Sequence, residues 1–183
     1  LRGRDIKRYI YEWKGLWVIL AKFGFYKEAH LYPAVVAHLS QFEQALKNRG
    51  QCRYGRTGKQ STADYPGQHH WLELDNNPRD EYLAEFEKEK VVWQELAQGS
   101  QFAFDEQGRF FVSNTAYIMT GTHLRYLLGY LNSRLNEITY SRWYCTKLGS
   151  SGTRWLNQHV LSIPVPPITP ENQPLVVQIE ALV

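Results

Sequence analysis

The order of the apolar patterns along the chain is the feature that most constrains its fold. A segment with helical spacing at 32–50 precedes three short strand-like segments, at 91–96, 100–104 and 109–121, and a second helical segment follows at 123–138. The helical segments repeat apolar residues every three or four positions, whereas the strand-like ones are rich in β-branched and aromatic residues. Because the strands cluster instead of alternating with helices, we predict an α+β fold with mixed or antiparallel strands, not a doubly wound sheet.

Both helical segments have the boundaries and the apolar face that helices favour. Pro33 suits a first turn, and Gly50 follows a basic last turn. The face predicted for 32–50 consists of Val35, Leu39, Phe42 and Leu46. The face predicted for 123–138 consists of Leu124, Leu127, Leu128, Leu131, Leu135 and Ile138. We expect the second face to lie in the core.

Three further segments have short-range signals. "GLWVILAKF" at 15–23 is typical of a buried strand bounded by glycines, and "DEYLAEFEKEK" at 80–90 of a short surface helix. The turn signal "DEQG" at 105–108 predicts a hairpin that joins the strands on either side of it.

The remaining segments are predicted to be loops and a closing helix. Residues 50–70 and "LGSSGTRW" at 148–155 are polar and contain glycine, as functional loops often do. Three prolines in "HVLSIPVPPI" at 159–168 favour an extended segment and exclude a central strand. "PENQPLVVQIEALV" at 170–183 begins an amphipathic helix.

Length and composition favour one folded domain. The chain has 183 residues, of which 43% are hydrophobic, and no apolar run approaches the roughly 20 residues of a membrane span. Two cysteines do not make a disulfide framework, so we expect a reducing, cytoplasmic location and no membrane partner. The abrupt ends, without an initiator Met, lead us to expect a fragment of a larger enzyme.

Charge is distributed unevenly, with a net charge of +3. Basic residues dominate 1–8, 47–59 and 138–170, and the last two segments contain no acid, whereas acids concentrate in 73–90. The three basic segments are either separate solvated loops or parts of one surface that faces phosphate groups. The sequence alone leaves both interpretations open.

The chain lacks the common catalytic motifs. It has no P-loop, no dinucleotide-binding glycine loop, no serine nucleophile elbow and no paired CxxC, and "DNNPRD" at 75–80 does not match the adenine methyltransferase loop. Two weak patterns remain. Four potential zinc ligands have no recognised spacing and fit loop histidines and small buried thiols as well: Cys52, His69, His70 and Cys145. A loose nuclease-like pattern fits ordinary polar alternation as well: Asp5, Glu12 and Lys14. We therefore predict no catalytic, cofactor-binding or metal-binding residue in this chain.

Several segments, in order, resemble one protein family. "LRGRDIKRY" at 1–9 resembles the segment that opens the target-recognition part of type IIG restriction–modification enzymes and BREX-type methyltransferases. The segments at 32–50, 69–74, 87–96 and 102–121 are similar to those that follow in that family. "LRYLLGYLNSRLNEI" resembles a helix shared with type I specificity subunits, and "LGSSGTRWLNQHVLSIPVPPI" resembles the closing segment. The chain thus resembles a TaqI-like C-terminal specificity domain.

The resemblance implies a role for the chain and a parent enzyme around it. Residues 1–170 would be a double-stranded DNA target-recognition domain, and 171–183 the start of a spacer helix. The parent chain would contain a methyltransferase domain that uses S-adenosylmethionine to methylate adenine, often with a Mg²⁺-dependent nuclease domain, in restriction or phage defence. The fragment itself would hold no cofactor. Two positions depart from the family: His70 stands where a tryptophan is common, and "EKEK" stands where a Lys-Pro-Lys run is common.

DNA binding needs phosphate contacts for affinity and base contacts for specificity, so we selected basic and amide side chains in the basic segments. The candidates are Arg2, Arg4, Lys7, Arg8, Asn48, Arg49, Arg53, Arg56, Lys59, Gln60, Arg142, Lys147, Ser150, Thr153 and Arg154.

Two of these candidates also have a structural alternative. Arg49 could cap the preceding helix, and Arg154 could pack against Trp155. Asp5 could pair with Arg4 or Arg8, or cap a turn, and "GRD" would then have a structural role. For the whole chain, the alternative to DNA recognition is a non-catalytic protein-interaction or scaffold domain with basic loops.

Overall fold

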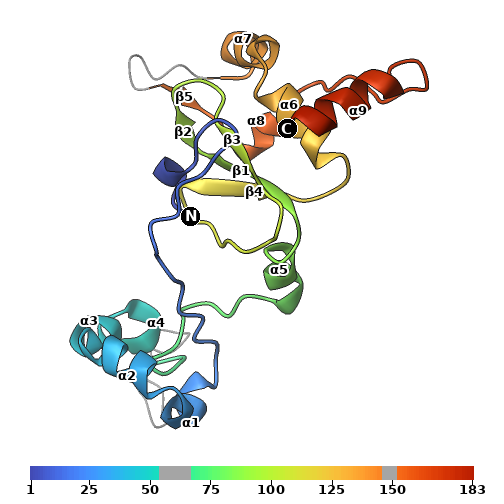
Figure 1. The fold of residues 1–183 in the computed structure, drawn as a ribbon. Helices are drawn as coiled ribbons and strands as arrows, with labels where there is room; N and C mark the ends of the chain where they lie inside the picture. The colour runs from blue at the N-terminus through green and yellow to red at the C-terminus, as the bar shows by residue number, and fades with distance from the viewer. Residues whose placement is uncertain (54–66, 146–151) are drawn as a thin grey trace. The chain divides into compact units, whose positions relative to one another are not determined.

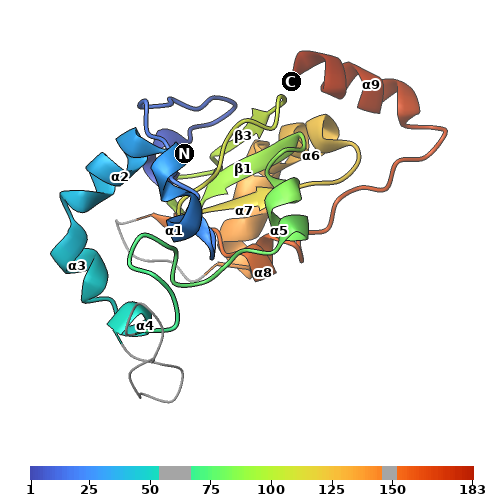
Figure 2. The same cartoon turned by 90° about the horizontal axis from the view of Figure 1, so that it is seen from below.

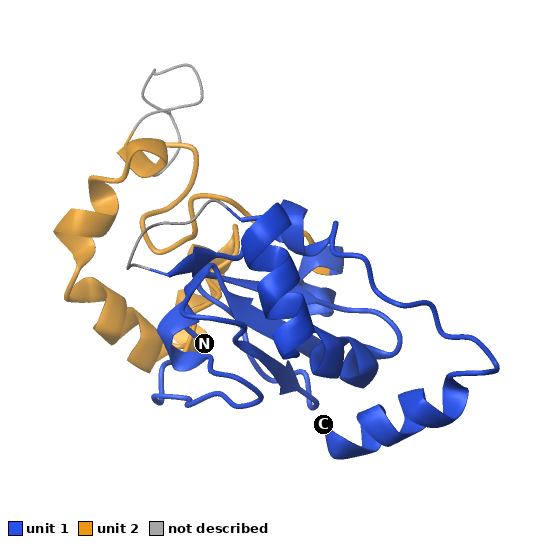
Figure 3. Ribbon diagram, turned by 90° about the horizontal axis from the view of Figure 1, so that it is seen from above, with its two compact units in different colours: residues 1–16, 81–183 blue, residues 17–80 orange. Residues whose placement is uncertain are grey.

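The computed structural model describes residues 1–53, 67–145 and 152–183. It divides into two compact units, which Figure 3 colours separately. Unit 1 comprises Leu1–Leu16 and Glu81–Val183, and unit 2 comprises Trp17–Asp80. We predicted a single domain over 1–170, and that boundary stays a prediction. Each unit is described by itself.

Unit 1 is built on an antiparallel sheet of three strands (Figure 1). Strand β1 (Lys90–Gln94) lies between β3 (Phe102–Asp105) and β4 (Ala116–Met119). In this register Val92 lies opposite Ala103 on one side and Ile118 on the other. Helices accompany the sheet, so the predicted α+β class is confirmed.

Alternation along β1 divides the core between the two faces of the sheet. Val91 and Trp93 face one core cluster, whereas Val92 faces the other, as the period of two in a strand requires. Helix α6 (Leu124–Leu131) lies along the sheet in Figure 2, and its leucines pack into the first cluster. Ile6, from the start of the chain, packs with Val92 in the second cluster.

The predicted hairpin at 105–108 is wrong, because β3 and β4 both pair with β1 and not with each other. The Asp105 carboxylate accepts the backbone N–H groups of Arg109 and Phe110 at 3.2 and 3.0 Å. These amides are therefore bound to a side chain, and the predicted strand at 109–121 begins only at Ala116. Asp105 also forms a fully buried ion pair with Lys90 at 2.6 Å.

The helix predicted at 123–138 is two helices, α6 and α7 (Arg134–Trp143). The break falls at Ser133, whose backbone is extended, and the preceding Asn132 side-chain amide bonds the N–H and the C=O of Phe102 at 3.1 and 2.8 Å. Ser133 then caps α7 by accepting from Asn136 N. The predicted apolar face is confirmed as far as Leu131 and wrong beyond it. Leu135 and Ile138 are exposed because α7 starts in a new direction.

A second, two-stranded sheet joins distant parts of unit 1. Strand β2 (Leu96–Ala97) pairs antiparallel with β5 (Thr153–Arg154). Trp155 follows β5 and is buried, with its ring stacked on Tyr140 of α7 at 3.9 Å between centroids. This stack holds β5, and therefore the edge of β2, against the core.

The segment after β5 closes unit 1. Helix α8 (Asn157–Val160) occupies the start of the segment that we predicted to be extended. The proline-rich part beyond it has no regular structure, and the hydroxyls of Tyr126 and Tyr130 bond the carbonyls of Pro166 and Pro164. The predicted C-terminal helix is confirmed as α9 (Gln173–Leu182). It packs on α6, and Arg125 donates to the Val183 carbonyl at 3.0 Å.

Unit 2 contains the short helices α1 (Phe25–Glu28), α2 (Pro33–Ser40), α3 (Glu43–Lys47) and α4 (Gly50–Arg53). The long helix predicted at 32–50 is thus divided among α2, α3 and the start of α4. Short 3₁₀ turns lie at Ala29–Leu31 in this unit and at Gly3–Asp5 in unit 1. None of the residues in α1, α2 and α3 is buried, so packing does not hold a longer helix together.

The short helix predicted at 80–90 is confirmed as α5 (Asp80–Glu85).

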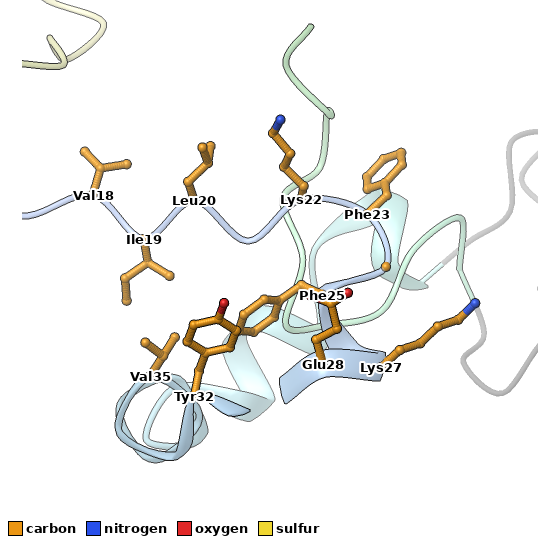
Figure 4. A pocket seen from close by; sticks show the side chains of 11 residues that line it. Val18, Ile19, Leu20, Lys22, Phe23, Phe25, Lys27, Glu28, Tyr32 and Val35 are labelled. Atoms are coloured by element: carbon orange, nitrogen blue, oxygen red, sulfur yellow. The ribbon is translucent and has the colours of Figure 1, made fainter. Parts of the chain in front are cut away.

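The strand predicted at 15–23 is wrong. This segment has no regular structure, and Trp17 and Val18 are exposed. Alternation is present without a partner strand: in Figure 4, Ile19 points towards Val35 and Tyr32, whereas Val18 points the other way. These residues line a hollow of about 570 Å³ within unit 2. An apolar run between glycines thus did not correspond to a buried strand, because most of its large side chains are exposed.

Candidate nucleic-acid interface

The opening segment of the chain folds around Asp5. The Asp5 carboxylate accepts from the backbone N–H of Arg2 at 3.0 Å and from its guanidinium at 2.9 and 2.8 Å. The Arg2 guanidinium holds the pKa of this carboxyl down to about 2. Gly3 is buried beside Thr115, where a Cβ would lie 2.6 Å from the Thr115 carbonyl oxygen. "GRD" is therefore architecture, as the turn-capping alternative predicted, although its arginine partner is Arg2.

The basic residues after this turn are more available. Arg4 and Lys7 are exposed, and the described part of the chain records no ion pair for either. Arg8 donates to the backbone carbonyl of Asn132 and lies 5.8 Å from the Tyr9 ring centroid. Its guanidinium is thus fixed at the junction between α6 and α7. Of this segment's two exposed cations without an ion pair among the described residues, Lys7 is the one that lies beside the strands.

Lys7 lines a polar hollow of about 310 Å³ beside strand β2. The other lining residues are Gln94, Leu96, Ala97, Gln98 and Gln101. On its other side β2 pairs with β5, so that Ala97 lies opposite Thr153 and Leu96 opposite Arg154. Residues that are distant in the sequence therefore meet along one short strand. We call the set Lys7, Gln94, Gln98, Gln101, Thr153 and Arg154 the β2 surface.

Arg154 is exposed on the β2 surface and anchored at its base. Its Nε lies 3.2 Å from one carboxylate oxygen of Glu95. The other oxygen of this carboxylate accepts from the Tyr117 hydroxyl. The backbone carbonyl of Arg154 accepts from the Tyr140 hydroxyl at 2.8 Å. The predicted packing alternative involved Trp155, but the recorded ion pair is with Glu95. The Nε of the guanidinium is thus held by Glu95, and the side chain as a whole is about half exposed to solvent.

The candidates in unit 2 are placed differently. Arg49 donates to the carbonyls of Leu46, Trp71 and Glu73 at 2.7–3.0 Å and pairs with Asp75 at 3.1 Å. The capping alternative for Arg49 is therefore confirmed and extended, since this one side chain ties α3 to the 71–75 segment.

The other residues of this basic segment that were predicted to contact DNA are either exposed or lie outside the described residues. Asn48 is exposed and its side chain accepts from Gln44 at 3.4 Å, and Arg53 is exposed at the end of α4. Arg56, Lys59 and Gln60 lie outside the described residues. Their predicted role stays a prediction.

In unit 1, Arg142 is exposed on the last turn of α7. Lys147 and Ser150 lie outside the described residues. Trp143, which the charge pattern did not select, is 70% exposed beside Arg142. Exposure of so large an aromatic ring cannot be read from helical spacing alone, because Tyr140, one turn earlier, is fully buried.

The two weak metal patterns have structural explanations in the described chain. Within residues 1–53, 67–145 and 152–183, no group of three or more His, Cys, Asp or Glu side chains is arranged to hold a metal ion. Asp5 is taken by Arg2, and Glu12 pairs with Lys14 at 2.7 Å. Burial raises the pKa of the Cys52 thiol, which disfavours the thiolate that binds metals.

A family model described as the TaqI-like C-terminal specificity domain matches residues 1–165. The chain belongs to this family. No curated protein matches it. The TaqI-like specificity domain is a DNA sequence-specificity module of restriction–modification enzymes, so this chain is a DNA-binding part of such an enzyme. Within the described residues, no helix is both long and apolar enough to cross a membrane.

The β2 surface includes two amide side chains that the charge pattern did not select. Gln98 and Gln101 lie outside the three basic segments and were not selected. Their only sequence signal is an amide on each side of Gly99–Ser100, between two strands. Amide side chains beside a free lysine are the groups that read base edges next to a phosphate.

Proposed function

We propose that the chain directs an S-adenosylmethionine-dependent, adenine-specific DNA methyltransferase to its target in double-stranded DNA, and that the β2 surface faces that DNA. The observation that carries the proposal is the convergence of Lys7, the Gln98–Gln101 turn and Thr153–Arg154 along one strand. In this proposal S-adenosylmethionine and Mg²⁺ belong to the methyltransferase and nuclease domains of the parent chain, which acts in the cytoplasm in restriction or phage defence.

Each part of the β2 surface would supply a different kind of contact. Lys7 forms no ion pair with any residue that the structure describes, so among these residues it has no internal partner to lose on approach to a phosphate. Arg154 keeps its Glu95 contact and offers its outer nitrogens. Phosphate contacts fix the register of a protein on the duplex, and the amides between them can then meet base edges.

Rigidity of the β2 surface also supports the proposal. A base-reading side chain must be held within a fraction of an ångström of its partner. Two contacts of Trp155 hold β5 against the core. Its ring stacks on Tyr140, and its backbone N–H donates to the Glu95 carbonyl at 2.6 Å. Gln94 and Thr153–Arg154 thus lie on strands of unit 1, and Gln98 and Gln101 lie in the short turn between two of its strands.

An exchange of segments between two related full-length enzymes with different targets tests the proposal. One chimera exchanges 81–165 together with the opening 16 residues, and the matched control exchanges only 17–80. We expect the methylated sequence, read by sequencing modified DNA, to follow the first exchange and not the second. A methylated sequence that stays with the catalytic domain in both chimeras contradicts the proposal. Cleavage of unmodified DNA by the same enzymes decides whether the parent is also an endonuclease.

A further inference from the structure

We propose that Gln98 is a base-reading residue of the β2 surface and that it recognises the major-groove edge of an adenine. This inference rests on the proposed function and adds a residue and a base to it. It starts from a single structural fact: Gln98 carries an exposed amide with no recorded hydrogen bond of its side chain in the described chain.

The backbone that carries Gln98 is held on both sides. Before it, Ala97 pairs with Thr153, and Gly152 lies so close that a Cβ there would meet the Ala97 carbonyl oxygen at 2.7 Å. After it, Gly99 adopts φ +80°, and a Cβ at Gly99 would lie 3.2 Å from the Glu137 carboxylate. The backbone of this turn is therefore packed against Glu137 of α7 on one side and Gly152 on the other, which holds the Cα of Gln98 in place.

The other amides nearby are occupied by internal contacts. In one orientation of its amide, the Gln94 nitrogen donates to the Gln101 side-chain oxygen. In the reverse orientation, the Gln94 nitrogen donates instead to the carbonyls of Gly3 and Leu96 at 3.2 and 3.0 Å, and the Gln94 oxygen faces Gln101. Gln94 thus buttresses Gln101 from beneath the hollow. Gln98 remains as the amide whose donor and acceptor are both available to a ligand.

Adenine is the base that matches a free amide. Its major-groove edge presents an acceptor at N7 and a donor at N6, and a glutamine amide satisfies both together. Lys7, on the other side of the hollow, offers a positive charge to the neighbouring phosphate. The hollow of about 310 Å³ gives the base edge room to approach the amide.

Atomic substitution in the DNA tests the inference in the full-length enzyme. The probe is a duplex with the enzyme's own recognition sequence, in which each adenine other than the methylated one is replaced in turn by 7-deazaadenine, which lacks the N7 acceptor. We expect wild-type affinity to fall about tenfold at one such adenine, as loss of a bidentate contact implies. The Gln98→Ala enzyme should bind the natural duplex about tenfold more weakly and should not respond to that replacement.

Gln107→Ala is the matched control, because Gln107 is also an exposed amide in a turn but lines a different hollow, with Arg109 and Arg125. It should behave as wild type with every duplex. If Gln98→Ala keeps the wild-type response to all replacements, or if no adenine responds in the wild type, the inference is overturned. That result leaves the segment exchange free to succeed, whereas failure of the exchange would remove the proposed function itself.

Discussion

Unit 1 and unit 2 are stabilised by different kinds of contact. In unit 1 the side chains of Trp93, Phe102, Tyr140 and Trp155 are almost fully buried around one sheet. In unit 2, helices α1, α2 and α3 bury no residue, and the strongest cross-links are polar bonds from Arg49 and to Glu73. The stability from apolar burial grows with the area removed from water, so a large buried ring contributes most. In a polar network the contribution of each side chain depends on whether its partners stay satisfied.

The same difference bears on function. The β2 surface is attached to the buried core of unit 1 through the Trp155 stack, so its side chains keep a fixed geometry. The candidates of unit 2 either take part in its internal network, as Arg49 does, or are exposed at helix ends, as Arg53 is. We therefore expect base discrimination to depend on unit 1.

Removal of the central ring of unit 1 should have the largest effect on stability. Trp155→Ala deletes a ring that stacks on Tyr140 at 3.9 Å and meets Phe102 edge-on at 5.3 Å. Truncation of a buried tryptophan costs about 3–5 kcal/mol, so we expect the free energy of unfolding in denaturant to fall by about 4 kcal/mol. Leu161→Ala, at an exposed apolar position, is the control and should change it by less than about 0.5 kcal/mol. A loss below about 1 kcal/mol for Trp155→Ala would show that unit 1 does not depend on this core.

Loss of the polar centre of unit 2 should have a smaller and local effect. Arg49→Ala leaves the carbonyls of Trp71 and Glu73 without their arginine donor, and it leaves Asp75 with His69 alone, at 3.2 Å. We expect the free energy of local unfolding to fall by about 2 kcal/mol within 17–80 and to stay unchanged elsewhere. The reason is that each buried acceptor without a donor costs about 1–3 kcal/mol. Amide hydrogen exchange of the whole chain measures it region by region. Arg79→Ala, at an exposed arginine of the same unit, should leave exchange unchanged, and equal loss of protection in both units would contradict the comparison.

An acid titration should give the smallest effect, since it removes one polar contact from a unit that keeps its core. The folded-state pKa of Asp5 is about 2, below the ordinary value of 3.8, so its contribution is complete above about pH 4. It is lost as the pH falls towards 2. We expect the free energy of unfolding of the wild type to exceed that of Asp5→Asn by about 1 kcal/mol near pH 6, because solvent screens the partly exposed Arg2 partner, and by almost nothing at pH 2. A difference between the two proteins that does not vary with pH would show that Asp5 is not held as an ion.

Much of unit 1 could be predicted from the sequence, because its periodicity reflects real burial. The strands at Lys90–Gln94 and Phe102–Asp105, the leucine face up to Leu131 and the closing helix α9 all follow from spacing. The errors lie where a side chain competes for nearby backbone groups: Asp105 in the expected hairpin and Ser133 in the expected helix. Such local competition leaves no signal in the apolar periodicity.

In unit 2 the sequence was misleading because apolar spacing at 32–50 was not accompanied by burial. The site shows the same limit. Lys7 and Arg154 were selected by charge, but their convergence on β2 needed the strand pairing, and Gln98 had no charge to mark it. Arg2 and Arg49 were selected by charge too, and both hold internal partners.

The salt dependence of DNA binding tests most directly the central claim that the β2 surface faces DNA. Affinity of the full-length enzyme for its target duplex is measured over a range of salt concentrations, for wild type, Lys7→Ala and the control Lys88→Ala, whose lysine pairs with Glu85 away from β2. We predict that the slope of log affinity against log salt becomes shallower by about 0.9 for Lys7→Ala and is unchanged for Lys88→Ala. A slope for Lys7→Ala equal to that of wild type would contradict the placement of the β2 surface on the DNA.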